Sequence, residues 1–461
     1  METNNRFVRM SIVLGILTFI SLILSWFALA DIYKGIESDL RMEWNIVRVN
    51  IVLSILFITI SLITIFKLKN ELMRSKFSYP TISFLLSIFS VCIFISACSK
   101  DDPDIPDAPD TLQSTFIKSG NHSGSYWPTN AWRTCSPEAV GINSEDLERL
   151  DAEASRLSEL TGIQSIVVIK DGYIIAEKYF DPNYTVDSLH PVFSITKSIT
   201  ATAFGIAFDD GLINRLEDSA ISFFPEYTLE NPSDYKSAIN LRHLLTMTAG
   251  FDWQELEYPY SDPRNSWSDW INSEDRVKHV LDKEVVNEPG TLYNYNTGVS
   301  HLLSVIIEKV SNQRTDLYVN EKLFEPLGIN SYEWLIDPQG HASGGHGCYL
   351  SPRSVAKIGL LYLNNGLWNG QQIVSSAWIA DATDKHIQRR YLSEFHYGYQ
   401  WWIHQDGFYC AVGYGGQWLI VDPANDLILV SNNDFGDSDY SRLSVPLGFF
   451  TDYIRPAVLN K

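Results

Sequence analysis

Cysteine is scarce in this sequence, and its placement excludes two common uses of the residue. The 461 residues contain five cysteines, and no two of them have the Cys-x-x-Cys spacing of a redox or zinc site. An odd number also argues against a complete disulfide framework in an exported domain. The stretch HASGGHG contains His341 and His346. We interpret it as a glycine-rich loop that contains two histidines, and we expect no bound metal.

Positive charge is also in deficit. The chain has 35 Lys and Arg against 55 Asp and Glu, which gives a formal net charge of −20. Because an acidic surface repels phosphate backbones, we expect no nucleic-acid partner. No glycine-rich phosphate loop or cofactor motif is evident in the sequence, so no cofactor is expected.

Apolar residues, by contrast, form three long runs within the first hundred residues. Residues 8–30, 45–66 and 77–98 each contain about 20 largely apolar residues, which is the length that spans a bilayer. A buried helical bundle is the alternative, but the polar spacers between the runs favour membrane segments.

Basic residues predict the orientation of these segments. Arg6 and Arg9 precede the apolar core of the first run, and the patch 67–76 has four basic residues and one acidic residue. The loop 31–48 carries no positive excess. Basic loops remain in the cytoplasm. We therefore expect residues 1–76 to form two transmembrane helices with a cytoplasmic basic patch, and everything after residue 98 to be extracytoplasmic, at the periplasm or the cell surface.

The third run, residues 77–98, has two interpretations. Its ending ISAC, with the basic MRSK stretch before it, resembles a bacterial lipoprotein signal in which Cys98 would be acylated. The alternative is an uncleaved third span. Both interpretations tether the protein to the membrane. Residues 99–130 are rich in Asp, Pro, Ser and Gly and are expected to form an acidic linker that cannot bury a core.

The remaining residues, 131–461, have an α+β pattern. Residues 143–157 are predicted to form an amphipathic helix, and 164–180 a β-hairpin about a Lys-Asp-Gly turn. A helical region is expected from 194 to about 360. Three strands, GYQWWIH, FYCAVGYGGQWLIVD and LILVSNND, and a closing helix are expected near the end. The pattern predicts one antiparallel sheet that takes strands from both termini, with flanking helices and an all-helical subdomain.

Ser194 and Lys197, in PVFSITKSIT, form a Ser-x-x-Lys pair inside a run of small and apolar residues. Residues three apart share a helix face, and burial lowers the pKa of a lysine. A neutral amine beside a serine hydroxyl can take its proton and create a nucleophile. A lysine that reaches solvent from a half-exposed helix is the alternative. Two further pairs, Ser233/Lys236 in a polar loop and Ser354/Lys357 at an ordinary helix start with a surface lysine, are interpreted as unrelated.

Two later stretches could complete such a site. Tyr295 lies on a polar turn in LYNYNTG, where a phenol could shuttle a proton to a leaving group, although a packed aromatic is the alternative. Glycines within FYCAVGYGGQWLIVD mark close approach of another backbone or a ligand. A backbone N–H at this strand, together with that of Ser194, could form an oxyanion hole.

The ordered motifs resemble those of the serine β-lactamase and penicillin-binding protein superfamily, closest to its class C-type branch. The stretches LRHLLTMTAGF, EPGTLYNYNTG, LFEPLGI and YGYQWW agree, and the resemblance covers nearly all of 131–461. It implies the β-lactamase/DD-peptidase-like fold, with Ser194 as the acylated nucleophile, Lys197 as its base partner and Tyr295 as general acid and base. The oxyanion N–H groups would belong to Ser194 and Tyr414, or to Gln417 in a shifted alignment.

The resemblance also implies which groups contact substrate, and where this chain departs from the family. Thr297, Gly413 and Gly415 are expected to contact substrate. Thr297 stands where the family usually has Asn, and Ala411 stands where it usually has a cation that holds a β-lactam carboxylate. The second departure favours an ester, amide or D-peptide substrate over a β-lactam. The stretch 251–270, dense in aromatic and acidic residues, is expected to form a rim loop by the site, with a structural role as the equal alternative.

Three functional hypotheses follow. The first is a membrane-tethered extracytoplasmic serine hydrolase that cleaves an ester or amide through an acyl-enzyme on Ser194. The second is a penicillin-binding-like ligand-binding or sensor module without turnover. The third is a membrane-assembly protein in which residues 1–72 matter and the outer domain is a passenger.

Overall fold

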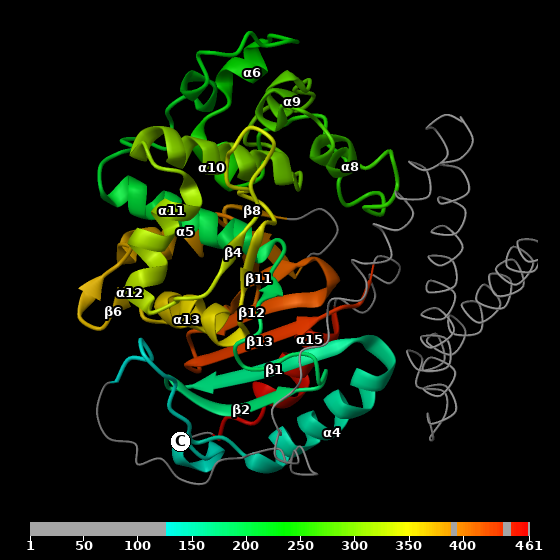
Figure 1. Cartoon of the computed structure of the whole chain (residues 1–461), viewed down its shortest axis with the longest axis vertical. Coiled ribbons are helices and arrows are strands. Elements are labelled where there is room, and N and C mark those ends of the chain that lie inside the picture. Colours follow the sequence, from blue (N-terminus) through cyan, green and yellow to red (C-terminus); the bar gives the residue numbers. More distant parts are fainter. Residues whose placement is uncertain (1–125, 389–393, 437–443, 460–461) are drawn as a thin grey trace, which may run out of the picture. The chain divides into compact units, whose positions relative to one another are not determined.

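An eight-stranded antiparallel sheet is the centre of the fold. The computed structural model describes residues 126–388, 394–436 and 444–459, and all of them lie within one unit, Thr111–Lys461 (Figure 1). The strand order is β2-β1-β13-β12-β11-β10-β9-β8, and every neighbouring pair is antiparallel. The strands are β1 (Ile163–Lys170), β2 (Tyr173–Tyr179), β8 (Ile387–Gln388), β9 (Phe395–Tyr397), β10 (Trp402–His404), β11 (Tyr409–Gly413), β12 (Gln417–Asp422) and β13 (Leu427–Asn433).

Strands from the two ends of the described unit pair with one another in this sheet, as the sequence predicted. β1 pairs with β13 in a register that places Val167 opposite Val430. The predicted hairpin is β1 and β2, and its turn uses Asp171 at φ 51° and Gly172 at φ 79°. Two successive residues with positive φ give the hairpin turn whose twist matches that of the flanking strands.

One predicted strand is two strands. FYCAVGYGGQWLIVD forms β11, a one-turn 3-10 helix η4 (Tyr414–Gly416) and β12, which pairs back onto β11. Gly415 and Gly416 have φ values of 71° and 91°, and they reverse the chain between the strands. The prediction treated these glycines as part of a continuous strand, but their positive φ makes them the turn.

Helices cover both faces of the sheet. One face packs against α4 (Ser144–Thr161), α15 (Val445–Phe449) and the π-helical turn η6 (Phe450–Ile454), which includes the predicted first and closing helices. The other face packs against α5 (Ile195–Asp209) and α13 (Pro352–Leu363). Side chains of β1 alternate between these two cores: Ile166 and Val168 face one, Val167 and Ile169 the other.

A mainly helical part lies beyond α5, in the upper half of Figure 1. It includes α10 (Thr297–Ser311), which packs against α5. Its shorter helices are η2 (Ala220–Phe223), α6 (Asp234–Ala238), α7 (Leu241–Leu245), α8 (Ser266–Ile271), α9 (Arg276–Asp282), α11 (Thr315–Val319), η3 (Asn320–Phe324) and α12 (Glu325–Leu327).

The predicted helical region between 194 and 360 is not helical throughout. A small antiparallel sheet consists of β3 (His190–Pro191), β5 (Cys348–Leu350) and β4 (Glu333–Trp334). Its strand β3 comes shortly before Ser194 in the chain. The short pair β6 (Leu367–Trp368) and β7 (Gln371–Gln372), and the helices η1 (Pro137–Val140) and α14 (Ser376–Ala382), complete the fold. Each of these strands has only two or three residues, which is too short for a period to appear in the sequence.

The predicted membrane segments 8–30, 45–66 and 77–98 lie outside the described residues. Among the residues that the structure does describe, no helix has the length and apolar composition needed to cross a bilayer. Ordered contacts begin before the predicted domain start at 131, because Trp127 packs on Trp368 and the Thr129 hydroxyl accepts a hydrogen bond from the Trp368 indole.

The reversal at Gly416 predicts a matched pair of stability effects. A Cβ at Gly416 would lie 2.4 Å from the Phe435 ring, whereas Gly407, at φ 90°, has open space around it. Gly407→Ala should cost about 1–2 kcal/mol for its backbone conformation alone. Gly416→Ala should cost at least about 2 kcal/mol more, because the ring must also move. Urea unfolding of the full-length protein in mild detergent measures both; equal losses would contradict the steric argument.

Candidate active site

Ser194 sits at a strained corner between β3 and α5. The preceding residue, Phe193, has φ 45°, which a non-glycine residue adopts only where its surroundings require it. Ser194 is the N-cap of α5, and residues Ile195 to Ala207 of that helix are buried. The serine therefore stands at the positive end of a buried helix dipole, with its hydroxyl facing a cavity.

Lys197 lies one turn further along α5 and is 1% exposed. Its amine nitrogen Nζ is 2.9 Å from Ser194 Oγ, 2.9 Å from Thr297 Oγ1 and 2.7 Å from the Gly345 carbonyl oxygen. Burial lowers the pKa of Lys197 to about 8, although the Glu255 carboxylate acts in the opposite direction. The structure thus brings together the predicted Ser-x-x-Lys pair, and it gives the amine two further partners.

Two elements far away in the sequence supply those partners. Thr297 begins α10, whose N-cap Asn296 accepts a hydrogen bond from the Val299 backbone N–H. Gly345 belongs to the HASGGHG loop, which runs close against α10. A Cβ at Gly344 would lie 2.2 Å from the Ser300 carbonyl oxygen, and one at Gly345 would lie 2.6 Å from Thr297 Cγ2. The glycines allow the loop to approach closely enough to reach the amine.

The two histidines of that loop have separate partners. His341 Nδ1 is 3.0 Å from Glu308 Oε2, and His346 Nδ1 is 3.0 Å from Ser343 Oγ. Within the described residues, no cluster of three or more His, Cys, Asp or Glu side chains has the arrangement of a metal site.

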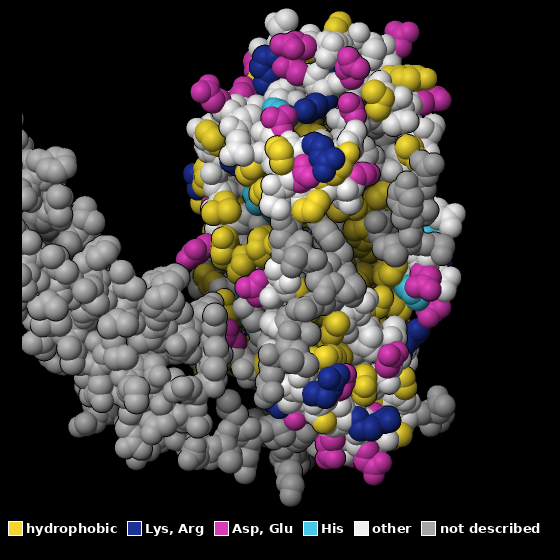
Figure 2. All heavy atoms as spheres, turned by 90° about the vertical axis from the view of Figure 1, so that its right-hand side faces the viewer, with side chains coloured by type: hydrophobic (Ala, Val, Ile, Leu, Met, Phe, Trp, Pro, Cys, Tyr) yellow, Lys and Arg dark blue, Asp and Glu magenta, His cyan; other side chains and the backbone are white. Residues whose placement is uncertain are grey.

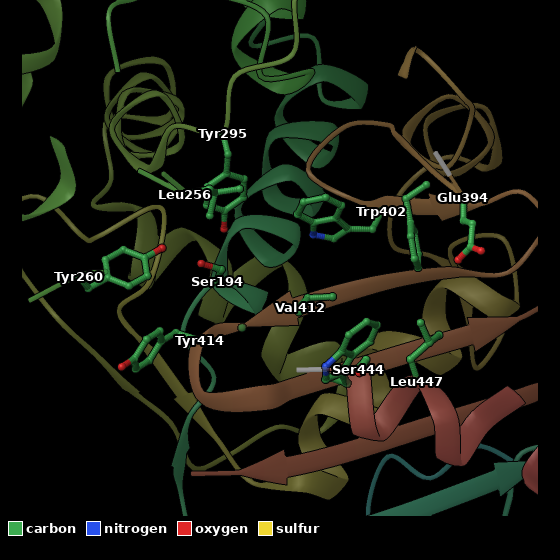
Figure 3. Close-up of a pocket in the computed structure, with 13 residues that line it drawn as sticks. Ser194, Leu256, Tyr260, Tyr295, Glu394, Trp402, Val412, Tyr414, Ser444 and Leu447 are labelled. Atoms are coloured by element: carbon green, nitrogen blue, oxygen red, sulfur yellow. The ribbon is translucent and has the colours of Figure 1, made fainter. Parts of the chain in front are cut away.

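Tyr295 completes the group of side chains around Ser194. Its ring centroid is 4.8 Å from Lys197 Nζ, and the ring stacks on Trp402 at 6.0 Å. Figure 3 shows the Tyr295 and Ser194 hydroxyls pointing toward one another across the cavity. The three side chains predicted to carry the chemistry therefore meet at one place.

The end of β11 forms the wall of the cavity next to Ser194. Gly413 lies so close to the chain before Ser194 that a Cβ there would be 2.4 Å from the Val192 carbonyl oxygen. Gly413 and Tyr414 line the cavity with Ser194, and the Tyr414 ring lies 5.3 Å from that of Phe193. This arrangement brings the predicted oxyanion residues, Ser194 and Tyr414, to one side of the cavity.

Three other predicted residues lie away from the cavity lining. Gln417 begins β12, and its side-chain amide contacts Asn433 and Asn432. Gly415 turns the chain, and its carbonyl accepts a hydrogen bond from the Phe435 N–H. Thr297, predicted to contact substrate, is 1% exposed and contacts Lys197 and Glu255.

The cavity has a volume of about 570 Å³ and a mostly apolar lining. Figure 2 shows hydrophobic side chains gathered across the middle of this side of the described unit. The described residues that line the cavity are Ser194, Leu256, Tyr260, Tyr295, Glu394, Phe395, Trp402, Val412, Gly413, Tyr414, Trp418, Ser444 and Leu447. Ala411, one residue before Val412, is 1% exposed and faces the core.

Glu255 is a buried residue of the site that was not predicted from the sequence. The stretch 251–270 was predicted to form a rim loop, and Leu256 and Tyr260 do line the cavity. Glu255 of the same stretch is instead 1% exposed, and it bonds to Thr297 directly behind Lys197. The only signal in the sequence was an acidic residue between aromatic ones, which is equally typical of a solvated loop.

The other two Ser-x-x-Lys pairs differ from this one in the use of the serine. Ser233 caps α6 by accepting from the Lys236 backbone N–H, and Ser354 Oγ bonds to Ser351 Oγ. The prediction that Lys357 lies on the surface is wrong. It is 7% exposed, and its amine donates to the carbonyls of Thr129 and Gly328, which the fold brings from distant segments.

A buried Ser/Lys pair at the start of the buried helix α5, beside a tyrosine and the end of a strand of the antiparallel sheet, defines a serine hydrolase of the β-lactamase and penicillin-binding protein superfamily. The family model described as Beta-lactamase matches residues 152–439, more than half of the chain. The chain therefore belongs to the Beta-lactamase family.

Individual relatives agree with this assignment. The 6-aminohexanoate-dimer hydrolase of Paenarthrobacter ureafaciens is 24% identical over 64% of this chain and 80% of its own length. The octameric penicillin-binding protein homologue from Pyrococcus abyssi has a TM-score of 0.54 and 20% identity, covering 69% of this chain and 79% of that one. EstCE1, a hydrolase with promiscuous acyltransferase activity, has a TM-score of 0.55 and 16% identity, covering 68% and 99%. At these identities the two structures support the fold alone.

The lowered pKa of Lys197 predicts a pH dependence for Ser194. Only a neutral amine can accept the serine proton, so the reactivity of Ser194 should rise as the pH rises through about 8. The rate of labelling by a fluorophosphonate measures this reactivity. We expect about a tenfold gain per pH unit below about pH 8 and a plateau above it. A rate that does not change between about pH 6 and about pH 10 would contradict a role for this amine.

Proposed function

We propose that this protein hydrolyses an ester or amide bond through an acyl-enzyme on Ser194. The observation that carries the proposal is the position of Lys197 Nζ. The amine is buried, contacts two other acceptors, and lies 2.9 Å from Ser194 Oγ. A buried amine with a pKa near 8 is a base matched to a weakly acidic hydroxyl at neutral or slightly alkaline pH.

In the proposed reaction, Ser194 Oγ attacks the substrate carbonyl carbon while its proton passes to Lys197 Nζ. The Tyr295 hydroxyl relays a proton to the leaving oxygen or nitrogen as its bond to the carbonyl carbon breaks. A water molecule then attacks the acyl carbon and gives up a proton to the same pair. The bond between Ser194 Oγ and the acyl carbon breaks, the pair returns the proton to Oγ, and the acid is released. The backbone N–H groups of Ser194 and Tyr414 would hold the negative oxygen in both halves of the reaction.

The described lining of the cavity favours a substrate with an apolar chain. Among the described residues of its lining there is no Lys, Arg or His, and Glu394 is the one charged side chain. Among these described residues a β-lactam carboxylate would therefore meet no cation, and Ala411 adds none. A short ester or linear amide fits this lining better. The similarity to a protein named for hydrolysis of the 6-aminohexanoate dimer supports the same choice.

The protein is further proposed to be membrane-tethered, with residues 131–461 outside the cytoplasm. The support is in the sequence: three apolar runs, a basic patch at 67–76 and the lipoprotein-like ending at Cys98. A tethered enzyme would meet substrates in the periplasm or at the cell surface.

Ser194→Ala tests the hydrolase proposal, and Ser354→Ala is its matched control from a second Ser-x-x-Lys pair. With a neutral p-nitrophenyl ester, the full-length wild type and Ser354→Ala should turn over and become labelled by a phosphonate. Ser194→Ala should lose labelling, and turnover should fall by at least about 1,000-fold. Labelling at Ser194 without turnover would overturn hydrolysis and indicate a ligand-capturing module. Turnover that survives in Ser194→Ala would overturn the acyl-enzyme.

The mass of the mature protein tests the tether. Cleavage and acylation at Cys98 should give a chain that begins at Cys98 and carries lipid, and Cys98→Ala should abolish both changes. An intact chain that fractionates with membranes would indicate a third span at 77–98. A full-length chain found only in the soluble fraction would contradict both forms of the tether.

A further inference from the structure

Glu255 is a buried carboxylate that four donors surround. Its Oε2 accepts from the Trp253 indole N–H at 2.8 Å and from the Thr297 backbone N–H at 2.7 Å. Its Oε1 accepts from the Tyr260 hydroxyl at 3.0 Å and from the Thr297 hydroxyl at 2.5 Å. These bonds use the acceptor capacity of an ionised carboxylate, which is what allows it to be buried. Glu255 is not among the residues that line the cavity.

The hydrogen bond from Thr297 to Glu255 determines whether Thr297 Oγ1 acts as a donor or as an acceptor toward Lys197 Nζ. A threonine hydroxyl has one proton, and the short contact to the carboxylate is typical of a charge-assisted bond that takes that proton. Thr297 Oγ1 therefore turns a lone pair toward Lys197 Nζ. The Gly345 carbonyl, the second partner of Nζ, can only accept.

A neutral amine has two N–H groups and one lone pair. If Thr297 Oγ1 and the Gly345 carbonyl take the two N–H groups, the lone pair is left for the third partner, Ser194 Oγ, at 2.9 Å. This is the direction in which the serine proton must travel. The orientation of the amine thus depends on the Thr297 proton, and that proton depends on Glu255.

We propose that Glu255 is a positioning residue. By accepting a hydrogen bond from the Thr297 hydroxyl, it orients the Lys197 lone pair toward Ser194. This inference rests on the proposed acyl-enzyme function and deepens it. The charge of Glu255 has a second, separable effect, since it raises the pKa of Lys197 against the effect of burial.

Glu255→Gln separates positioning from a structural role. The glutamine oxygen can replace Oε2 and accept from the indole and backbone N–H groups. Its NH₂ group then faces the two hydroxyls, which can accept instead of donate. Every partner stays bonded, so the fold should survive. The Thr297 proton, however, must now point at Lys197 Nζ and compete for the lone pair that Ser194 needs.

The test compares full-length wild type with Glu255→Gln, Thr297→Val, Thr297→Ser and the double variant Glu255→Gln/Thr297→Val. The readouts are the melting temperature, kcat and KM for a p-nitrophenyl ester, and the pH profile of phosphonate labelling. Glu257→Gln is the matched control, because Glu257 is exposed and two residues away. It should behave as wild type.

We expect Glu255→Gln to melt near the wild-type temperature and to lose at least about 100-fold in kcat and labelling rate, with KM changed less than about threefold. The pH range over which its labelling rate rises should move to lower pH, because the negative charge that favours protonated Lys197 is gone. Thr297→Val should lose about as much, and Thr297→Ser, which keeps the hydroxyl, at most about tenfold. The double variant should be no slower than Thr297→Val, because Glu255 acts through that hydroxyl.

A folded Glu255→Gln with wild-type rates and pH profile would overturn the proposal. If that variant unfolds, Thr297→Val decides, and wild-type labelling by it would overturn the proposal equally. Labelling needs only removal of the serine proton, so it tests Glu255 even if no ester is hydrolysed. Failure of the proposed function would give a different result. Either ester turnover would persist in Ser194→Ala, or the wild type would show no ester turnover.

Discussion

The burial of one amine, Lys197 Nζ, is the constraint around which the site is built. An ammonium or amine withdrawn from water needs hydrogen-bond partners, and leaving one polar group without a partner costs on the order of 1–3 kcal/mol. Three segments converge to supply them: α5 itself, the start of α10, and the HASGGHG loop. The absence of side chains at Gly344 and Gly345 is what lets the loop reach α10. The packing of α5, α10 and this loop and the chemistry of the serine are therefore consequences of the same requirement.

Burial of a lysine is nevertheless not what distinguishes this pair. The lysines of the Ser194, Ser233 and Ser354 pairs are all buried, and Lys236 and Lys357 also donate to backbone carbonyls. Among the described residues, backbone carbonyls accept the hydrogen bonds of those two amines, and each serine bonds to a group at the start of its helix. Around Lys197 the partners include two hydroxyls, one of which faces a cavity. The identity of the partners, rather than the depth of burial, separates a reactive lysine from a structural one.

Much of this architecture could be predicted from local patterns. The β1–β2 hairpin follows from two β-rich runs around Lys-Asp-Gly, and α4 from a polar cap before an amphipathic run. The meeting of terminal strands follows from the α+β order. Where prediction failed, the deciding quantity was not local. Whether Gly415 and Gly416 extend a strand or reverse it depends on φ, and whether Lys357 is exposed depends on carbonyls that tertiary contacts bring to it.

Glu255 illustrates the same limit at the site and bears on a departure that the sequence did reveal. By its resemblance to the superfamily motif, this chain has Thr297 where an Asn is expected. An amide presents separate donor and acceptor atoms, so its bonding direction is set by which atom faces the lysine. A hydroxyl can donate or accept through one oxygen, so by itself it leaves the direction open. The Glu255 carboxylate, which can only accept, removes that ambiguity by taking the hydroxyl proton. Thr297 and Glu255 together thus present Lys197 with the fixed acceptor that an amide oxygen would present alone. The second half of that unit comes from a segment about 40 residues away, which a motif confined to one stretch of sequence does not include.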